Sequence, residues 1–472
     1  MKKPLSLALG AAIIALAYPA SAWFLGSSIE ATLAEQYRAL DEQPYVKLVS
    51  RDFQRGLFSS TETATIELVG LSELSSEAPE EGALPETSST APASPIQITV
   101  RTVIQHGPLA GFSTVAAAVA DSELVLTAEQ QQQVSALLGD KKPLQIHTVF
   151  SLFGGGTSTL SSPAFALDLP KKADGKTARA SWSGFQMSVD FSSHMKRYTM
   201  QAEAPGLEIK DDTGGVAQFT GLHMSGNQER MFDDVPGFYS GTTTMKLDQL
   251  SFVEGGENVP EGIAKQPLLL KQLSYDASIP VNGEFIDLIG KIGVETAQFQ
   301  AQDYGPVHYD FSLRHLHARS TAELYKALMK WYGDPARLAA KESGSPLMGM
   351  EALREPALAL LKYSPELHLD RISFKSPQGE AKISASAKLG ALQPEELANP
   401  FMLLGKLDIN ADLALPEDII GGTLRAEQLA AFTEQGYVTR DGNMLHSKIT
   451  FANGQVAVNG KPFNPMAMGG GE

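Results

Sequence analysis

Two histidines at alternating positions, His315 and His317, have the spacing in this chain that best suits metal chemistry. Alternate residues of a β-strand face the same side, so both imidazoles would lie on one face, with His308 as a candidate third ligand. The surrounding sequence adds no cysteine and no obvious carboxylate cluster that could complete a coordination shell. The favoured interpretation is therefore an exposed strand face or a turn, and we predict no metal site.

Three further polar motifs are interpreted as turns. His106 stands directly before Gly107-Pro108, where a histidine more often hydrogen-bonds its neighbours than acts as a base. Asp211-Asp212, which Gly214-Gly215 follows, and Asp233-Asp234 could in principle offer oxygen atoms to calcium. Neither pair has the spaced oxygen ligands of a calcium-binding loop, so solvated turns are favoured.

A glycine run and the tryptophans also have structural interpretations. Gly154-Gly155-Gly156-Thr157-Ser158 resembles a phosphate-binding loop, but no lysine follows it and both flanks have the character of strands. A flexible hairpin loop is the better prediction. Trp182 and Trp331 lack the interleaved lysines and arginines of a base-stacking surface, so we expect them in the core.

The common sequence-visible active sites are missing. The chain has no P-loop, no Rossmann glycine pattern, no HExxH zinc motif and no G-x-S-x-G nucleophile elbow. It also has no cysteine, which excludes disulfides, thiolate metal sites and cysteine nucleophiles. We therefore predict that the protein is not an enzyme and assign no catalytic, cofactor-binding or metal-ligating residues and no cofactor.

Size and charge limit the architecture and the partners. At 472 residues, the chain exceeds the roughly 250 to 300 residues that one hydrophobic core supports, so two domains or a duplicated unit are expected. Its composition, 43% apolar and 19% charged, is that of a globular protein. The formal net charge of −16 disfavours binding to nucleic acid.

The N-terminus predicts a membrane anchor. Lys2 and Lys3 precede an uncharged stretch, Pro4 to Ser28, that is long enough to span a bilayer as a helix. The leading positive charge keeps that end in the cytoplasm and sends the body to the periplasm of a bacterial inner membrane. Ala20-Ser21-Ala22 supports the alternative of a cleaved signal peptide, residues 1–22. Against cleavage, the apolar run continues through Trp23 and a helical stripe extends beyond it.

Alternation of polar and apolar residues recurs along most of the body and predicts long antiparallel strands. The predicted fold class is α+β, mostly β, with one transmembrane helix, curved sheets and a few packed helices. The predicted strands are 45–54, 57–69, 96–104, 145–153, 178–191, 198–204, 242–253, 268–279, 292–299, 308–316 and 367–374.

Turn and cap chemistry marks further elements. Asp441-Gly442, Asn453-Gly454 and Asn459-Gly460 predict tight hairpin turns near the C-terminus. Capping boxes, Thr127 with Gln130 and Ser320 with Glu323, predict helices that begin at those residues. The four predicted helices are 127–138, 320–331, 356–363, which starts at a proline, and 423–435, which ends before Gly436.

Two stretches share an order of elements: a strand, a Gly-Pro dipeptide at 107–108 or 305–306, alternating residues and a capped helix. An internal duplication would give two similar lobes, and the alternative is chance reuse of turn and cap chemistry. The predicted segments are the anchor 1–28, a helix and first strands 29–70, a disordered acidic Pro/Ser-rich insertion 71–95, lobe one 96–265, lobe two 266–465 and a flexible tail 466–472.

The order of several short motifs resembles the YdgA-like bacterial envelope proteins, a domain family of unknown function, over nearly the whole chain. The motifs are Arg55 to Ser60, His106 to Leu109, Tyr304 to Val307, Leu360 to Glu366, Ser376 to Gly379 and Gly454 to Lys461. The resemblance implies attachment to the inner membrane and self-association. It supplies no catalytic residues.

Three function classes follow. The first is a membrane-tethered envelope factor that acts by protein contact as a homodimer, with another envelope protein as the other candidate partner. The second is a carrier that binds a lipid or another apolar ligand in a groove of the β-rich body. The third and least favoured is an enzyme whose site is assembled from scattered residues.

Overall fold

A computed structural model describes residues 21–34, 37, 46–68, 96–169, 177–255, 268–299, 302–332, 351–390, 392, 396, 400–420 and 426–463. Most of the predicted anchor, the predicted insertion 71–95 and the predicted tail 466–472 lie outside these residues. Within them, no helix combines the length and the apolar character that crossing a membrane requires.

The chain divides into two compact units. Unit 1 contains residues 1–165, 184–200 and 328–349, and unit 2 contains residues 166–183, 201–327 and 350–472. The predicted lobe boundary at residues 265 and 266 falls inside unit 2. It lies between β14 (Tyr239–Val253) and β15 (Leu268–Ile279), which pair with each other. The internal duplication stays a prediction.

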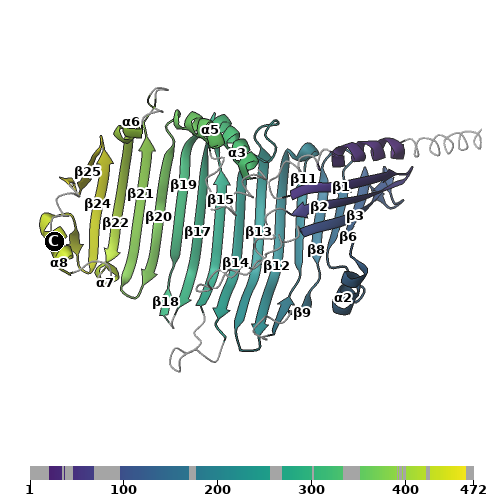
Figure 1. Cartoon of the computed structure of the whole chain (residues 1–472), viewed down its shortest axis with the longest axis horizontal. Helices are drawn as coiled ribbons and strands as arrows, with labels where there is room; N and C mark the ends of the chain where they lie inside the picture. Colours follow the sequence, from purple (N-terminus) through teal and green to yellow (C-terminus); the bar gives the residue numbers. More distant parts are fainter. Residues whose placement is uncertain are drawn as a thin grey trace, which may run out of the picture. The chain divides into compact units, whose positions relative to one another are not determined.

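Unit 1 is an antiparallel sheet with an N-terminal helix, residues 21–34, packed on it (Figure 1). The strands pair in the order in which they follow one another along the chain. They are β1 (Val46–Arg55), β2 (Ser59–Leu68), β3 (Ile96–His106), β6 (Ala118–Leu124), β7 (Gln145–Phe150), β8 (Gly156–Ser162) and β11 (Phe185–Phe191). Helix α2 (Ala128–Leu138) joins β6 to β7, and β4 (Leu109–Ala110) pairs with β5 (Thr114–Val115) between β3 and β6.

The core of unit 1 lies between the N-terminal helix and the sheet. Ile29 of the helix packs with Ile104, Phe150 and small residues of β6, and Leu25 and Leu33 extend the contact along one helix face. The spacing of these helix residues, four apart, is that of an amphipathic stripe. The stripe that the sequence predicts beyond the anchor is therefore used to cover the sheet.

A buried charge pair lies beneath the same helix. The side chain of Glu62 is only 1% exposed and accepts a short hydrogen bond from Arg51 of the neighbouring strand. The Arg51 guanidinium also lies 5.3 Å from the ring centroid of Tyr37 and 5.5 Å from that of Phe53. Burial and the charge of Glu62 raise the pKa of Tyr37 to about 12. The two rings thus flank a guanidinium whose side chain is 20% exposed and whose Nη2 atom is buried without a hydrogen-bond partner.

We expect Glu62→Gln to destabilise unit 1, because it leaves the Arg51 cation buried without its counter-charge. Loss of one partner of a buried pair costs about 3 kcal/mol or more. Hydrogen exchange of β1 and β2 peptides in the full-length protein measures this as a loss of protection. Glu123→Gln is the matched control, because its partner Lys142 is exposed and such pairs contribute less than about 1 kcal/mol. Equal protection in both variants would contradict the role given to Glu62.

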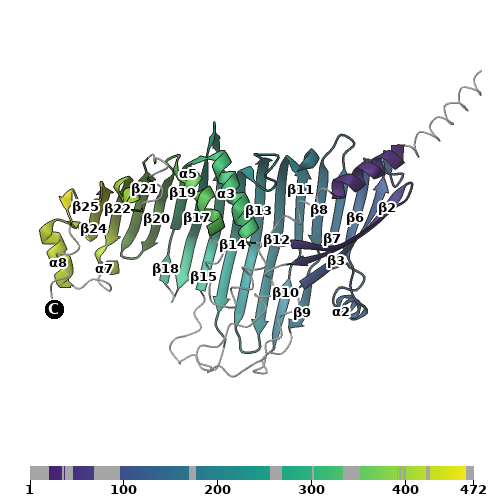
Figure 2. The same ribbon diagram turned by 45° about the horizontal axis from the view of Figure 1, so that its top comes forward.

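Unit 2 is an antiparallel meander (Figures 1 and 2). From β13 to β25 each long strand pairs with the next one along the chain. In addition to β14 and β15, these strands are β13 (Val216–Arg230), β17 (Phe285–Phe299), β19 (Val307–His317), β20 (Glu366–Ser376), β21 (Gly379–Leu389), β22 (Leu407–Pro416), β24 (Met444–Ala452) and β25 (Gln455–Val458). The shorter β16 (Val281–Asn282), β18 (Gln302–Tyr304), β23 (Thr439–Asp441) and β26 (Lys461–Pro462) complete hairpins, and β9 (Phe165–Leu169), β10 (Ala178–Trp182) and most of β12 (Arg197–Asp211) precede them.

Five helices begin in unit 2, among the residues that the structure describes. Helices α3 and α5 contribute Ala318, Ala322, Tyr325 and Leu360 to a core cluster with strand residues such as Ile286. The helices are α3 (Ala318–Tyr332), α5 (Glu351–Leu361), α6 (Pro400–Gly405), α7 (Glu417–Ile420) and α8 (Ala426–Gln435).

The structure confirms that the chain is mostly β, with antiparallel sheets and few helices. The predicted turns at Asp441-Gly442, Asn453-Gly454 and Asn459-Gly460 are present, with positive φ at every residue of the last two. The capping box of Thr127 and Gln130 is also present. The predicted strand 178–191 is wrong, because it is broken into β10 and β11 at Gly184, which has φ of +99°.

Two helix starts differ from the prediction. Helix α3 begins at Ala318, and the amide of Ser320 donates to Nδ1 of His317, so His317 takes the capping position that the sequence assigned to Ser320. Pro356 lies inside α5, which begins at Glu351, and not at the start of the helix. A proline there removes one intrahelical hydrogen bond. Packing of Leu360 on the unit 2 core offsets that loss.

Candidate functional site

The predicted histidine pair belongs to an aromatic cluster in unit 2. The ring of His315 stacks on Phe285 with centroids 4.1 Å apart, and the ring of His317 stacks on Tyr363 at 4.0 Å. Phe285 and Tyr363 meet edge to face at 6.2 Å. Both imidazoles contact Phe285, but the strand is bulged at His315, which has φ of +57°, so simple alternation does not place them. Each imidazole has a packing partner on its flat face.

Hydrogen bonds hold the same two rings. Nδ1 of His315 lies 2.8 Å from the carbonyl oxygen of Tyr363, and Nδ1 of His317 lies 2.9 Å from Oγ of Ser320. His308 is nine residues from His317 on one strand, about 30 Å at ~3.3 Å per residue, so it is not the third ligand. Within the described residues, no three His, Asp or Glu side chains converge in a way that could hold a metal ion.

His106 is a buried residue of unit 1. Its ring is 1% exposed, with Nε2 2.8 Å from Oγ of Ser60 and Nδ1 3.2 Å from the carbonyl oxygen of Leu57. A carbonyl only accepts, so Nδ1 carries the proton and Nε2 accepts from the serine. Burial lowers the pKa of His106, and the nearby charge of Arg55 lowers it further. The ring serves as a neutral hydrogen-bonding bridge between β3 and the β1–β2 turn.

The acidic motifs and the glycine run lie at turns. Oδ1 of Asp211 accepts from the Gly215 amide at 2.6 Å, and Oδ2 of Asp212 accepts from Oγ1 of Thr177 at 2.9 Å. Asp234 forms a two-pronged ion pair with Arg319, which lowers the pKa of Asp234 to about 2. The run Gly154-Gly155-Gly156 connects β7 to β8, which confirms the predicted hairpin.

The tryptophans are less buried than a core position requires. Trp182 is half-buried and meets Phe219 edge to face, with centroids 6.4 Å apart. Trp331 is also half-buried and packs edge to face on Tyr332.

A row of apolar residues crosses eight strands of unit 2. Each residue of the row is directly opposite the next one on the neighbouring strand. The row consists of Met224, Met245, Tyr275, Ile292, Tyr309, Ile372, Ile383 and Leu413. At ~4.8 Å between neighbouring strands it is about 34 Å long. Directly opposed side chains touch, so the row is continuous.

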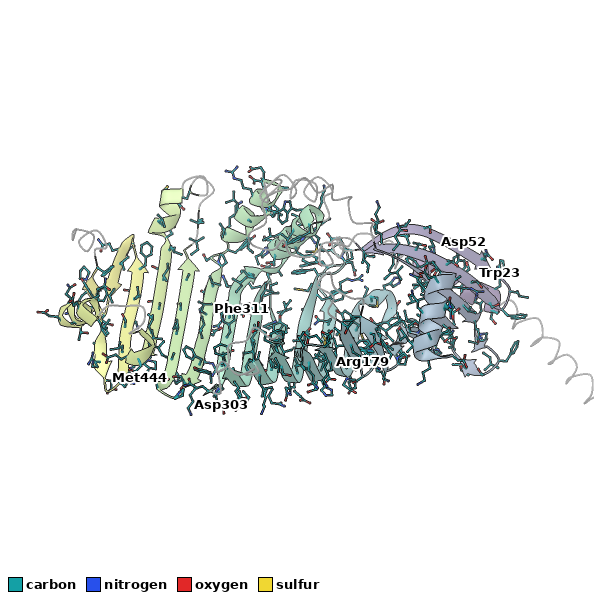
Figure 3. All side chains as sticks on the ribbon, turned by 60° about the horizontal axis from the view of Figure 1, so that its bottom comes forward. Trp23, Asp52, Arg179, Asp303, Phe311 and Met444 are labelled. Carbon is teal, nitrogen blue, oxygen red and sulfur yellow. The ribbon has the colours of Figure 1, made fainter. Side chains whose placement is uncertain are left out.

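Parallel rows on the same face are apolar too. One runs from Leu222 through Leu247, Leu273, Val294, Val307 and Phe374 to Ala381. The other contains the small residues Gly226, Ala277, Gly290, Ala385 and Ala411, together with Phe311, Leu369 and one polar residue, Thr243. Figure 3 labels Phe311 on this face. We call the surface formed by the three rows the apolar face.

The apolar face is covered only in part. Ile279 and Leu288, at one end of it, pack against the core cluster of α3 and α5. In the apolar row itself no side chain is fully buried, and Ile292 and Tyr309 are 41% and 40% exposed. Large contiguous apolar surfaces of this kind mark binding sites for other molecules.

The opposite face of the same sheet is polar and charged. It bears two shallow hollows of about 370 and 480 Å³, the first lined by Glu366, His368, Lys388 and Asp408. Glu366 lies 2.6 Å from Lys388, and this pairing lowers the pKa of Glu366 and raises that of Lys388. Charges paired across strands are typical of a solvated sheet face.

The alternation of polar and apolar residues was predicted from the sequence, but the apolar row was not. Strands β13, β21 and β22 were not predicted, although Lys382, Ser384 and Ser386 alternate with Ile383, Ala385 and Ala387 within β21. The signal was present in each strand, but only the register of pairing shows that the apolar residues align.

These features define a mostly β protein of two units with a partly exposed apolar sheet face. The chain belongs to DUF945, a family of bacterial proteins of unknown function, whose model matches residues 1–466. No curated protein and no solved structure matches the chain significantly.

The buried state of His106 predicts a pH dependence of stability. Its pKa is lowered in the folded protein and near 6.5 in the unfolded chain, so the unfolded chain binds the proton more tightly. The contribution of His106 is therefore complete above about pH 6.5 and is lost as the pH falls below that value. Denaturation midpoints between about pH 7 and pH 5 should fall more steeply for the native chain than for His106→Gln.

The exposed His223 provides the control for that measurement. His223→Gln should keep the native slope of stability against pH. An identical slope in the native chain and in His106→Gln would contradict the assignment.

Proposed function

We propose that the protein is a membrane-tethered envelope protein whose unit 2 binds an extended apolar ligand, namely the acyl chains of a lipid, along the apolar row. The observation that carries this proposal is the continuity of the row, in which eight apolar residues are opposed in sequence across the strands. Six of them are of intermediate burial, Ile292 and Tyr309 are about 40% exposed, and none is fully buried. The predicted inner-membrane anchor, with the body in the periplasm, would place unit 2 within reach of lipid. The YdgA-like assignment belongs to the same proposal.

The chemistry of the face supports a flexible aliphatic ligand. Its length of about 34 Å exceeds the ~15 Å, half of a bilayer's hydrocarbon core, that one acyl chain spans, so the row is long enough for such a chain. Met224 and Met245 at one end are unbranched and adapt to irregular partners. The three rows contain no charged residue, so an acyl chain could lie along them without desolvating an ion.

Self-association is the second candidate, and the same exposure favours it. A second copy could cover the apolar face with its own. In that case the protein would act by protein contact as a homodimer. A binding role of either kind needs no catalytic residues and no cofactor, and we propose neither.

Photo-cross-linking in cells that produce the full-length chain separates the two candidates. We expect a photoreactive residue at Tyr309 to yield a peptide that carries the mass of a lipid, because that side chain is on the apolar row. The same residue at Lys382, on the polar face of β21, is the control and should yield no lipid adduct. A cross-linked dimer at Tyr309 would favour self-association, and no adduct at all would contradict both.

A pair of adjacent substitutions tests the face itself. Ile383→Lys places a cation on the apolar row, and Ser384→Lys places it on the opposite face, where Asp412 is its cross-strand partner. We expect the first to lower the lipid adduct at Tyr309 by about tenfold or more, because an unpaired ammonium against an acyl chain costs more than ~1.4 kcal/mol. The second should leave it unchanged. Equal yields would contradict the proposal.

A further inference from the structure

Three connections of unit 1 present apolar side chains at one end of its sheet. They are the β1–β2 turn, the segment 107–117 between β3 and β6, and the loop 151–155 between β7 and β8. Alternate connections of an antiparallel meander lie at the same end. Their exposed apolar residues are Phe58, Leu109, Phe112, Val115, Leu152 and Phe153, which we call the apolar tip. Phe112, Val115 and Phe153 are 71%, 74% and 96% exposed.

The residues of the apolar tip form one patch. The rings of Phe58 and Phe112 are 6.2 Å apart, and Leu109 pairs with Val115 across β4 and β5. Val115, Leu152 and Phe153 line one hollow of about 330 Å³. A patch of this kind is costly in water unless another molecule covers it.

Charge is distributed unevenly between the two ends of unit 1. Residues 107–120 and 151–158 contain no charged side chain. The exposed Lys196 is in the connection that follows β11, where Ser193 approaches Gly154 closely, and the exposed Arg197 is the first residue of β12. The opposite end carries helix α2, with its run of glutamines, followed by Asp140, Lys141 and Lys142. Among the described residues, the end that carries the apolar tip therefore combines an apolar centre with a cationic border.

The N-terminal helix starts at that same end. Cζ of Arg55, the last residue of β1, lies 3.9 Å from the centroid of the Trp23 ring. Gly26 is so close to the ring of His106 that a Cβ atom there would lie 2.5 Å from it. Trp23 and Phe24 are themselves 46% and 72% exposed. Residues 21–28, the described part of the sequence-predicted membrane segment, thus lie next to the apolar tip.

We propose that the apolar tip inserts into the surface of the lipid bilayer beside the predicted tether. Aromatic and aliphatic side chains enter the boundary between headgroups and acyl chains, and Lys196 and Arg197 face anionic headgroups. The net charge of −16 repels such headgroups, so the apolar side chains drive insertion and the two cations offset the repulsion locally. Unit 1 then binds the membrane through its own surface as well as through the N-terminal segment. This inference is independent of ligand binding by unit 2.

The absence of cysteine in the chain permits a direct test. Full-length variants Phe112→Cys, Phe153→Cys and Gln132→Cys are labelled with the environment-sensitive dye nitrobenzoxadiazole. They are reconstituted into vesicles of phosphatidylethanolamine and phosphatidylglycerol, with or without bromine on the acyl chains. Gln132 is the control, because it is exposed on α2 at the opposite end. We expect brominated lipid to remove about half or more of the emission at positions 112 and 153, and none at 132.

Two outcomes would overturn the proposal. In the first, iodide in the water quenches the dyes at positions 112 and 153 as strongly as the dye at 132. That result would show that the tip stays in solvent. Dyes shielded from iodide yet insensitive to brominated lipid would show that protein covers the tip. Both native side chains are largely exposed, so the substitutions leave the fold intact, and either position alone decides the test.

Discussion

Alternation of side chains across an antiparallel sheet is the constraint on which unit 2 depends. Each strand sends successive residues to opposite faces, and a slip of one residue in pairing would exchange the two faces. The pairing register of the eight strands keeps Met224 through Leu413 in line, while Lys382 and Asp412 lie on the other face. Bulges in β19 and β20 each add one residue to their strand, and beyond the bulge of β20 Phe311 pairs with Leu369, so apolar residues remain opposite each other. One regular backbone pattern thus produces a charged face and an apolar face.

Unit 1 buries polar side chains as well as apolar ones. Its helix covers the sheet, and several buried polar groups have partners: Nε of Arg51 with Glu62, and His106 with Ser60 and Leu57. Buried polar groups that find such partners favour one arrangement of the chain over others. Gly26 permits the close approach of helix and sheet that these contacts need. The position of the helix on unit 1 therefore follows from specific contacts as well as from apolar area.

Local chemistry explains which elements could be predicted. The Asp-Gly and Asn-Gly turns and the capping box of Thr127 depend on residues close in sequence, and they were found. The start of α3 was missed because an imidazole, His317, performs the role that the pattern gave to Ser320. The break at Gly184 was missed because apolar alternation continues on both sides of it.

Features that depend on pairing between distant strands could not be found in the same way. The stacking of His315 on Phe285 and of His317 on Tyr363 joins segments that the sequence places far apart. The apolar row has the same origin, since each strand contributes one residue to it and nothing local fixes the partner. The burial of His106 likewise depends on the β1–β2 turn and on the N-terminal helix.

The meander of unit 2 allows its sheet to become longer or shorter by one hairpin at a time. Because consecutive long strands are neighbours from β13 to β25, a hairpin could be gained or lost without rethreading any other strand. Each hairpin would lengthen or shorten the sheet by about 10 Å, two strand spacings, and would keep the two faces in phase. Homologues with different numbers of hairpins could thus suit molecules of different size with one unchanged building plan.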